Sequence, residues 1–221
     1  YRSKIPADDL SKKPLYNKLL REIKFPLHVD TLAVRESTLE YEEEKTFEKG
    51  AGLLSFNKFN LFATDINSGF GQKKLPDVKI TINCRFMNVS PMKVNWRFNV
   101  LDKSDGFNIK GSILQFPAKR LKPFTKPYMN VDVDGTLNEV YFNFTGNDLR
   151  SKGDFAIKYD DIKVTIYQKN NRKKKNKFLS AVGNLFVKND SKEKIKEAEV
   201  EVERIPEKSF YNFFWRNIGE G

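Results

Sequence analysis

Residues 78–113 read VKITINCRFMNVSPMKVNWRFNVLDKSDGFNIKGSI, and apolar and polar side chains alternate through them in three consecutive runs. Successive side chains of a β-strand point to opposite faces, so each run predicts a strand with one apolar and one polar face. The apolar positions are Val78, Ile80, Ile82, Cys84, Phe86, Met92, Val94, Trp96, Phe98, Val100, Phe107, Ile109, Gly111 and Ile113. We therefore expect an antiparallel sheet with a continuous apolar face. Whether that face covers the protein's own core or a ligand is the main functional question.

Further strand patterns flank this region and predict a mostly-β fold. The expected architecture is a twisted antiparallel meander that forms a curved sheet or groove, with short helices at its ends. Asp160-Asp161 shifts the phase of one strand, which indicates a β-bulge. Predicted strands cover 27–34, 38–43, 53–66, 131–133, 137–145, 155–166 and 200–202, and predicted helices cover 14–23, 178–187 and 209–218, with a short helix or irregular link at 117–129. We expect three parts: an N-terminal helical or linker segment (1–24), the β-meander (25–205) and a C-terminal aromatic helix (206–221).

The chain is basic, with 40 Lys and Arg against 29 Asp and Glu and a formal net charge of +11. Such an excess permits nucleic acid, an anionic membrane or an acidic protein as a partner. The densest basic run lies in a predicted loop at 169–177 and lacks the aromatic residues that stack on bases, so we expect no nucleic-acid partner. The run is either a solvated tip or a patch for lipid headgroups or a partner protein. It contains Arg172, Lys173, Lys174, Lys175 and Lys177.

Residue types that carry catalysis or bind metals are sparse. His28 and Cys84 are the sole members of their types, too few for a zinc site or a catalytic triad, and Cys84 is expected to be a small buried apolar residue. Residues 130–135 fit the opening of an EF-hand loop, but Tyr141 stands where a bidentate Glu is needed. We therefore expect no enzymatic activity, no metal and no cofactor.

The C-terminal helix is unusually aromatic. Phe210, Tyr211, Phe213, Phe214 and Trp215 fall within six positions, more than one buried stripe needs. We expect a docking helix in which Phe210 and Phe214 seal the end of the sheet, while Tyr211 and Trp215 meet a membrane surface or a partner protein.

Several motifs occur together in the second half of the chain. They are GTLNEVYFNFTGND from Gly135, YDDIKV from Tyr159, the basic run, FLSAVGNLFV from Phe178 and FYNFFWR from Phe210. Together they resemble the C-terminal region of the large AsmA-like envelope proteins of diderm bacteria, especially the Bacteroidetes type. The resemblance covers 130–218 well and 25–128 in general character.

This resemblance implies a non-catalytic protein of the periplasm, anchored in the inner membrane by an upstream helix. The chain begins at Tyr1 and contains no run of ~20 apolar residues, so we expect it to be part of a longer protein. The family's architecture implies a curved β-groove that passes phospholipids or other envelope lipids between the inner and outer membranes. The alternative is a structural or assembly module that docks on an outer-membrane protein complex. The expected lipid-binding residues are Val78, Ile80, Ile82, Phe86, Met92, Val94, Trp96, Phe98, Val100, Phe107, Ile109 and Ile113.

Overall fold

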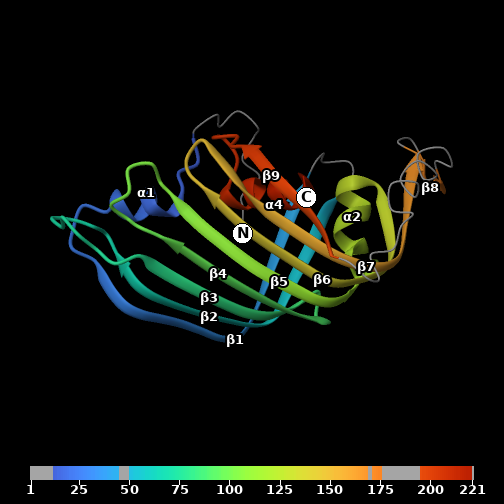
Figure 1. Ribbon diagram of the computed structural model, residues 1–221, viewed down its shortest axis with the longest axis horizontal. Helices are drawn as coiled ribbons and strands as arrows, with labels where there is room; N and C mark the ends of the chain where they lie inside the picture. Colours follow the sequence, from blue (N-terminus) through green and yellow to red (C-terminus); the bar gives the residue numbers. More distant parts are fainter. Residues whose placement is uncertain (1–11, 45–49, 169–170, 176–194, 221) are drawn as a thin grey trace.

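A computed structural model describes residues 12–44, 50–168, 171–175 and 195–220. Strands β1 to β7 pair antiparallel in sequence order, and β8 and β9 both pair with β7, at different parts of that strand (Figure 1). The fold is therefore a mostly-β antiparallel meander, as the sequence predicted. The strands are β1 (His28–Glu44), β2 (Ala51–Asn67), β3 (Val78–Phe86), β4 (Ser90–Phe98), β5 (Phe107–Pro117), β6 (Val131–Gly146), β7 (Arg150–Gln168), β8 (Asn171–Lys175) and β9 (Lys196–Glu203).

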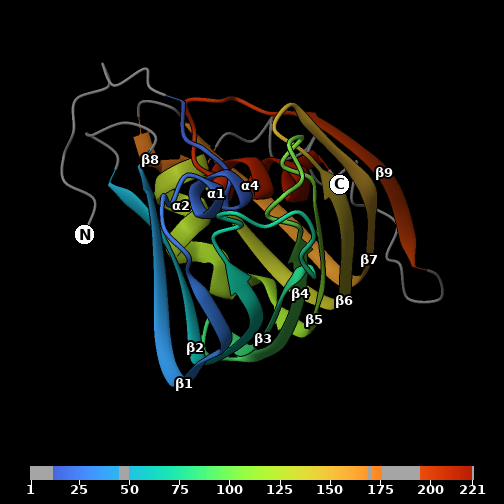
Figure 2. The same ribbon diagram turned by 90° about the vertical axis from the view of Figure 1, so that its left-hand side faces the viewer.

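The sheet is curved, and the helices lie on its concave side. Figure 2 shows the sheet as a trough, with β1 along one wall, β9 along the other and the helices between them. The helical elements are α1 (Tyr16–Arg21), the 3-10 turn η2 (Ala118–Leu121), α2 (Lys122–Met129) and α4 (Phe210–Glu220). The concave face is the apolar face of the alternating strands, so the helices cover apolar side chains while the convex face stays in water.

The strand register aligns apolar residues in rows that cross the sheet. Directly paired residues of an antiparallel sheet share a face. One row on the concave face starts at Leu32 on β1 and continues through Ala63, Ile80, Trp96, Ile109, Phe144, Gly153 and Val200. The next row starts at Val34 and continues through Leu61, Ile82, Val94, Gly111, Phe142 and Phe155. The apolar lining is therefore continuous from β1 to the opposite wall.

Strand β1 differs from the prediction of two strands separated at residues 35–37. It is one strand whose register shifts between Val34 and Ser37, with Glu36 at φ 45°. The Asn60 side chain on β2 bonds both the backbone N–H and the carboxylate of Glu36. A bulge accommodates extra residues without ending a strand, which is why the interruption of the apolar pattern did not mark a turn.

The predicted bulge at Asp160-Asp161 is confirmed, and it bends β6 and β7 together. Asp161 has φ 51°, and the register shifts opposite it, between Asp134 and Thr136. Gly135 has φ 103°, and a Cβ there would lie 2.5 Å from the Asp161 carbonyl oxygen. Only glycine fits this position. Residues 131–133 and 137–145 consequently belong to one bent strand, β6.

The basic run was predicted as a loop, but residues 171–175 form the short strand β8, which pairs with the end of β7. Alternation cannot reveal a strand in which every side chain is polar. The predicted helix at 178–187 and Lys177 lie outside the described residues. The C-terminal helix is present as α4, and the Ser209 hydroxyl accepts a hydrogen bond from the Asn212 N–H at its start.

Candidate functional site

The concave face over the middle of the sheet is covered by aromatic side chains of α4. The Phe210 ring stacks on Trp96, with centroids 4.7 Å apart and planes 8° apart, and lies edge-on to Phe107. Phe213 is buried beside Phe107. Phe214 lies edge-on to Phe142 and Phe144 of β6. These contacts fill the trough over β4, β5 and β6 with the chain's own side chains.

Helix α1 covers the same face at the end of the trough where β4 ends. Leu15 is fully buried, and the Tyr16 ring meets Trp96 edge-on at 5.0 Å. The buried Asn17 amide donates to the Gly106 carbonyl at 2.8 Å. Arg21 donates to two backbone carbonyls of the 99–106 loop and forms a 2.6 Å ion pair with the buried Asp105. Although α1 has six residues, these long-range bonds fix its position.

Most of the predicted groove residues therefore belong to a filled core. The half-buried members of the predicted set are Ile80, Ile82, Trp96 and Ile113. The buried members are Val78, Phe86, Met92, Val94, Phe98, Val100, Phe107 and Ile109. The expectation of an open groove along the whole 78–113 face is corrected, because α1 and α4 occupy that space over β4 and β5.

The same apolar rows are uncovered at their β1 ends. Leu32 is 46% exposed, whereas Val200 at the other end of its row is buried. Leu39, which pairs with the core residue Phe56, is also exposed. We call this region the β1–β3 strip; it comprises Leu32, Val34, Leu39, Leu61, Ile80 and Ile82. Within the described chain β1 pairs with β2 alone, so the strip reaches an open edge of the sheet.

Sequence reasoning included Ile80 and Ile82 of this strip but missed its β1 and β2 members. The bulge after Val34 and the register shift between Asn57 and Asn60 interrupt the alternation in both strands. The signal that could have found them is the pairing of Leu32 and Val34 with the alternating residues of β2 and β3. That pairing depends on residues that are distant in the sequence and cannot be inferred from the sequence of β1 alone.

The aromatic helix is oriented differently from the prediction in one respect. Phe210 and Phe214 face the sheet, and Tyr211 is exposed. Trp215, which was expected to face outward, contacts Tyr41 at 6.4 Å and Phe124 at 6.2 Å between ring centroids. Trp215 thus joins α4 to β1 and α2, and the outward surface expected for a partner loses its largest side chain.

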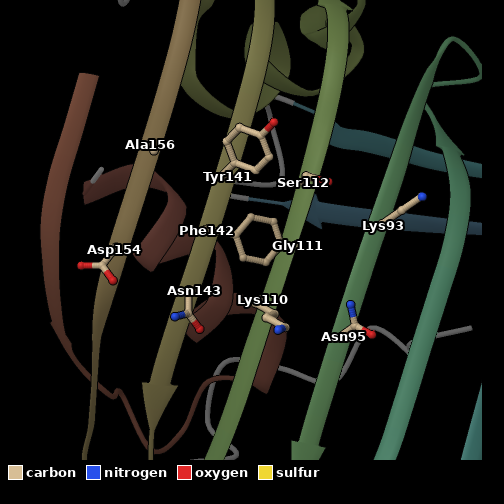
Figure 3. Close-up of a pocket in the computed structure, with 10 residues that line it drawn as sticks. All are labelled: Lys93, Asn95, Lys110, Gly111, Ser112, Tyr141, Phe142, Asn143, Asp154 and Ala156. Carbon is tan, nitrogen blue, oxygen red and sulfur yellow. The ribbon is translucent and has the colours of Figure 1, made fainter. Parts of the chain in front are cut away.

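The convex face has a shallow depression of about 350 Å³ around Gly111. Figure 3 shows its side chains, which come from four neighbouring strands, β4 to β7. Its polar walls are formed by Lys93, Asn95, Lys110, Ser112, Tyr141, Asn143 and Asp154. The hydrogen bond that Tyr141 donates to Glu139 raises the pKa of the phenol, so Tyr141 stays protonated at neutral pH. This lining holds no thiol, imidazole or hydroxyl–base pair that would act as a nucleophile.

Potential metal and redox groups are dispersed or engaged. Burial raises the pKa of the Cys84 thiol to about 11, which keeps it neutral and unreactive at neutral pH. Asp132, from the segment that resembles an EF-hand opening, pairs with Lys122 and Lys126 and accepts a hydrogen bond from Tyr167. Across the described residues, no three His, Cys, Asp or Glu side chains are grouped to hold a metal ion.

No helix in the described part of the chain is long and apolar enough to cross a membrane. Comparison of the chain with protein-family models, with curated proteins and with solved structures gave no match.

Proposed function

We propose that the protein is a non-catalytic lipid-handling module at the periplasmic face of a cell envelope, and that acyl chains lie on the β1–β3 strip. The observation that supports this most is the difference in exposure between the two ends of the apolar rows. Leu32 is 46% exposed whereas Val200 at the other end of its row is buried, and in the neighbouring row Val34 is half-buried whereas Phe155 is buried. A self-contained sandwich would cover both ends, because exposed inward-facing apolar residues lose hydrophobic stabilisation.

The dimensions of the strip suit a single acyl chain. From Leu32 to Leu39 the strand rises about 20 Å, which exceeds the ~15 Å depth of one leaflet of a bilayer's hydrocarbon core. Each methylene that leaves water gains ~0.8 kcal/mol. This attraction has no directional requirement, so a chain is held and can slide without any chemical step. A charged headgroup would remain in water at the open β1 edge.

The resemblance to AsmA-like envelope proteins supports the same proposal. In this proposal, the strip carries phospholipids or other envelope lipids between the inner and outer membranes. The helices α1 and α4 restrict the lipid path to the β1 side of the trough. The alternative of a module that docks on an outer-membrane protein complex through α4 has less support, because Trp215 packs inward.

Site-specific photocrosslinking tests this proposal with controls on the same two strands. Benzoylphenylalanine at Leu32 or Leu61 would sit on the concave strip. At Ala33 or Phe62 it would sit on the convex face. These two residues pair with each other, and each directly follows a strip residue, Leu32 or Leu61, in its strand. We expect lipid adducts, identified by mass spectrometry after crosslinking in cells, at Leu32 and Leu61 and not at Ala33 and Phe62.

Phe62 is a stringent control because it is 52% exposed, slightly more than Leu32. Equal lipid labelling on both faces would mean that exposed apolar residues capture lipid non-specifically. Labelling confined to the convex face, or no lipid adduct at any of the four positions, would contradict lipid handling by the strip.

A further inference from the structure

Two exposed phenylalanines lie on neighbouring loops at the end of the trough where β1 begins and β2 ends. Phe25 is 60% exposed and Phe70 is 47% exposed. The fully buried Ser68 joins their loops: its hydroxyl donates to the Phe25 carbonyl at 2.9 Å and accepts from the Phe70 N–H at 3.3 Å. Leu27 adds two hydrogen bonds to the same serine. The two rings are therefore presented by a fixed framework of backbone.

Three exposed lysines lie on the same two loops. Lys24 precedes Phe25, and Lys73 and Lys74 follow the turn that carries Phe70; all three are exposed and make no ion pair with a described residue. The turn itself is tight, with Gly69 and Gly71 at positive φ and a hydrogen bond from the Gln72 N–H to the Gly69 carbonyl. Phe70 is consequently at the tip of the loop.

Several acidic side chains at this end have partners within the protein, and the exposed Glu22 and Asp30 on either side of Phe25 pair with Lys18 and His28. Asp105 pairs with Arg21, and Asp148 pairs with the buried Arg204. Burial disfavours the charged form of Asp102, but hydrogen bonds from Ser104 and from the Gly106 backbone outweigh it and lower its pKa. These contacts partly neutralise the negative charge of the carboxylates. The lysines near the two phenylalanines extend into solvent.

A third apolar side chain stands on a neighbouring loop at the same end. Leu149, in the turn between β6 and β7, is 74% exposed. Its turn is bonded to the 99–106 loop, because the Asp148 N–H donates to the Ser104 carbonyl. Figure 1 places α1 and the loop after β2 at one end of the molecule, and Figure 2 shows this end facing the viewer.

We infer that this end of the sheet docks on an anionic lipid bilayer. We call the surface the strand-end rim; it comprises Phe25, Phe70 and Leu149 together with Lys24, Lys73 and Lys74. The apolar side chains enter the boundary between headgroups and acyl chains, and the ammonium groups contact the headgroups. Each basic residue near an anionic surface adds attraction, and each inserted apolar side chain adds the hydrophobic contribution.

The composition of the rim favours a bilayer over a protein partner. The apolar residues stand singly on separate loops, with lysines between them. Protein interfaces have a contiguous apolar core from which lysine is depleted. A bilayer surface deforms around separate side chains, and its anionic headgroups attract lysine. It therefore accommodates this spacing without requiring a complementary shape.

The inference does not depend on lipid binding in the β1–β3 strip. The rim acts by insertion of loop residues, whereas the strip would hold an acyl chain along the strands. Docking would bring the open start of β1 close to a membrane. The vesicle experiment below and the photocrosslinking experiment use different residues, so each can fail while the other succeeds.

Vesicle sedimentation of the 221-residue chain tests the inference. Vesicles of phosphatidylcholine alone are compared with vesicles that contain about a third phosphatidylglycerol, which supply the anionic surface. The double variant Phe25→Ser/Phe70→Ser should bind the anionic vesicles at least about tenfold more weakly than the unmodified chain. Phe62→Ser, which removes an equally exposed phenylalanine far along the convex face, should bind as the unmodified chain does.

Two further measurements separate insertion from simple charge attraction. The triple variant Lys24→Ser/Lys73→Ser/Lys74→Ser should weaken binding to anionic vesicles and reduce its salt dependence. An environment-sensitive dye on Phe70→Cys should shift to shorter emission wavelength on vesicle binding, whereas the same dye on Phe62→Cys should not. Circular dichroism establishes that each variant remains folded.

Three results would overturn the inference: no binding of the unmodified chain to anionic vesicles, unchanged binding by the Phe25→Ser/Phe70→Ser variant, or equal weakening by Phe62→Ser. A chain that avoids vesicles but sediments with an isolated protein partner through Phe25 and Phe70 would make the rim a protein interface.

Discussion

A few aromatic side chains decide whether the apolar face is open or filled. Phe210 is the central one, since its ring stacks on Trp96 and meets Tyr16 and Phe107 edge-on. Edge-on and stacked pairs of rings add specific attraction to the hydrophobic effect. The same α-helix carries Tyr211, one residue further, which is exposed. The neighbouring residues Phe210 and Tyr211 therefore differ in how much they contribute to the packing of the core.

We predict that Phe210→Ala lowers the free energy of unfolding by about 3–5 kcal/mol, because it leaves a cavity beneath Trp96. Tyr211→Ala is the matched control and should cost less than about 1.5 kcal/mol, since Tyr211 is 41% exposed and its removal leaves a gap that water can fill. Urea denaturation measures both, with the change expected in the midpoint and not in the slope. Equal costs for the two substitutions would contradict the placement of α4 on the sheet.

At the scale of elements, α4 is part of the core of the trough. Its residues Phe210 and Phe213 are buried, and Asn217 accepts a 2.6 Å hydrogen bond from Ser151 of β7 while donating to the Phe213 carbonyl. The sequence led us to expect a docking helix with one face on the sheet and the other toward a membrane or partner. The contacts indicate that α4 also contributes to folding, because they bury apolar area on both α4 and the sheet.

We predict that deletion of residues 209–221 exposes the face over β4 to β6 and destabilises the remaining chain. The truncated protein should bind a dye for apolar surfaces and unfold at markedly lower urea concentration than the complete chain. A truncation that stops after Ile218 keeps every aromatic residue of α4 and serves as the control. A chain without 209–221 that unfolds at the same urea concentration as the control would show that α4 is dispensable for folding.

The edge element β1 shows how bulges conceal a long strand. Its 17 residues remain in one ladder with β2 because the extra residues near Glu36 are absorbed by a local twist. The bulge also restores the inward orientation, so that Val34 before it and Leu39 after it both face the trough. This is the reason that the strip extends from Leu32 to Leu39 across the bulge.

At the scale of the whole molecule, basic charge is present at two separate ends. The rim lies where β1 begins, and β8 lies at the opposite end of the sheet (Figure 1). The two ends differ in that the rim combines lysines with exposed phenylalanines. A polybasic segment alone attracts an anionic surface through charge, and salt screens that attraction within ~8–10 Å.

Charge reversal of β8 should therefore act differently from changes at the rim. Lys173→Glu/Lys174→Glu/Lys175→Glu lowers the formal net charge from +11 by two per substitution, to +5. We expect about threefold weaker binding to anionic vesicles at physiological salt and no difference at high salt. The loss from Phe25→Ser/Phe70→Ser should persist at high salt. Unchanged binding would leave β8 as a solvated part of the sheet, and complete loss at every salt concentration would make β8 the docking end.

The sequence by itself determined the fold class, the two-faced sheet and the aromatic helix. These depend on side-chain periodicity, which local backbone geometry converts directly into faces. The bulge at Asp160-Asp161 was visible for the same reason. The pattern of residues 78–113 fits an open groove and a filled core equally well, because it specifies which side chains point inward and not what meets them.

Only the tertiary structure decided which part of the apolar face is covered. Tyr16, Trp96 and Phe210 are widely separated along the chain and meet in one cluster. Likewise, Ser68 brings the loops of Phe25 and Phe70 together across more than forty residues. The physical reason is that coverage depends on which distant segments the folded sheet brings into contact, and that outcome reflects the summed packing and hydrogen bonding of the whole chain.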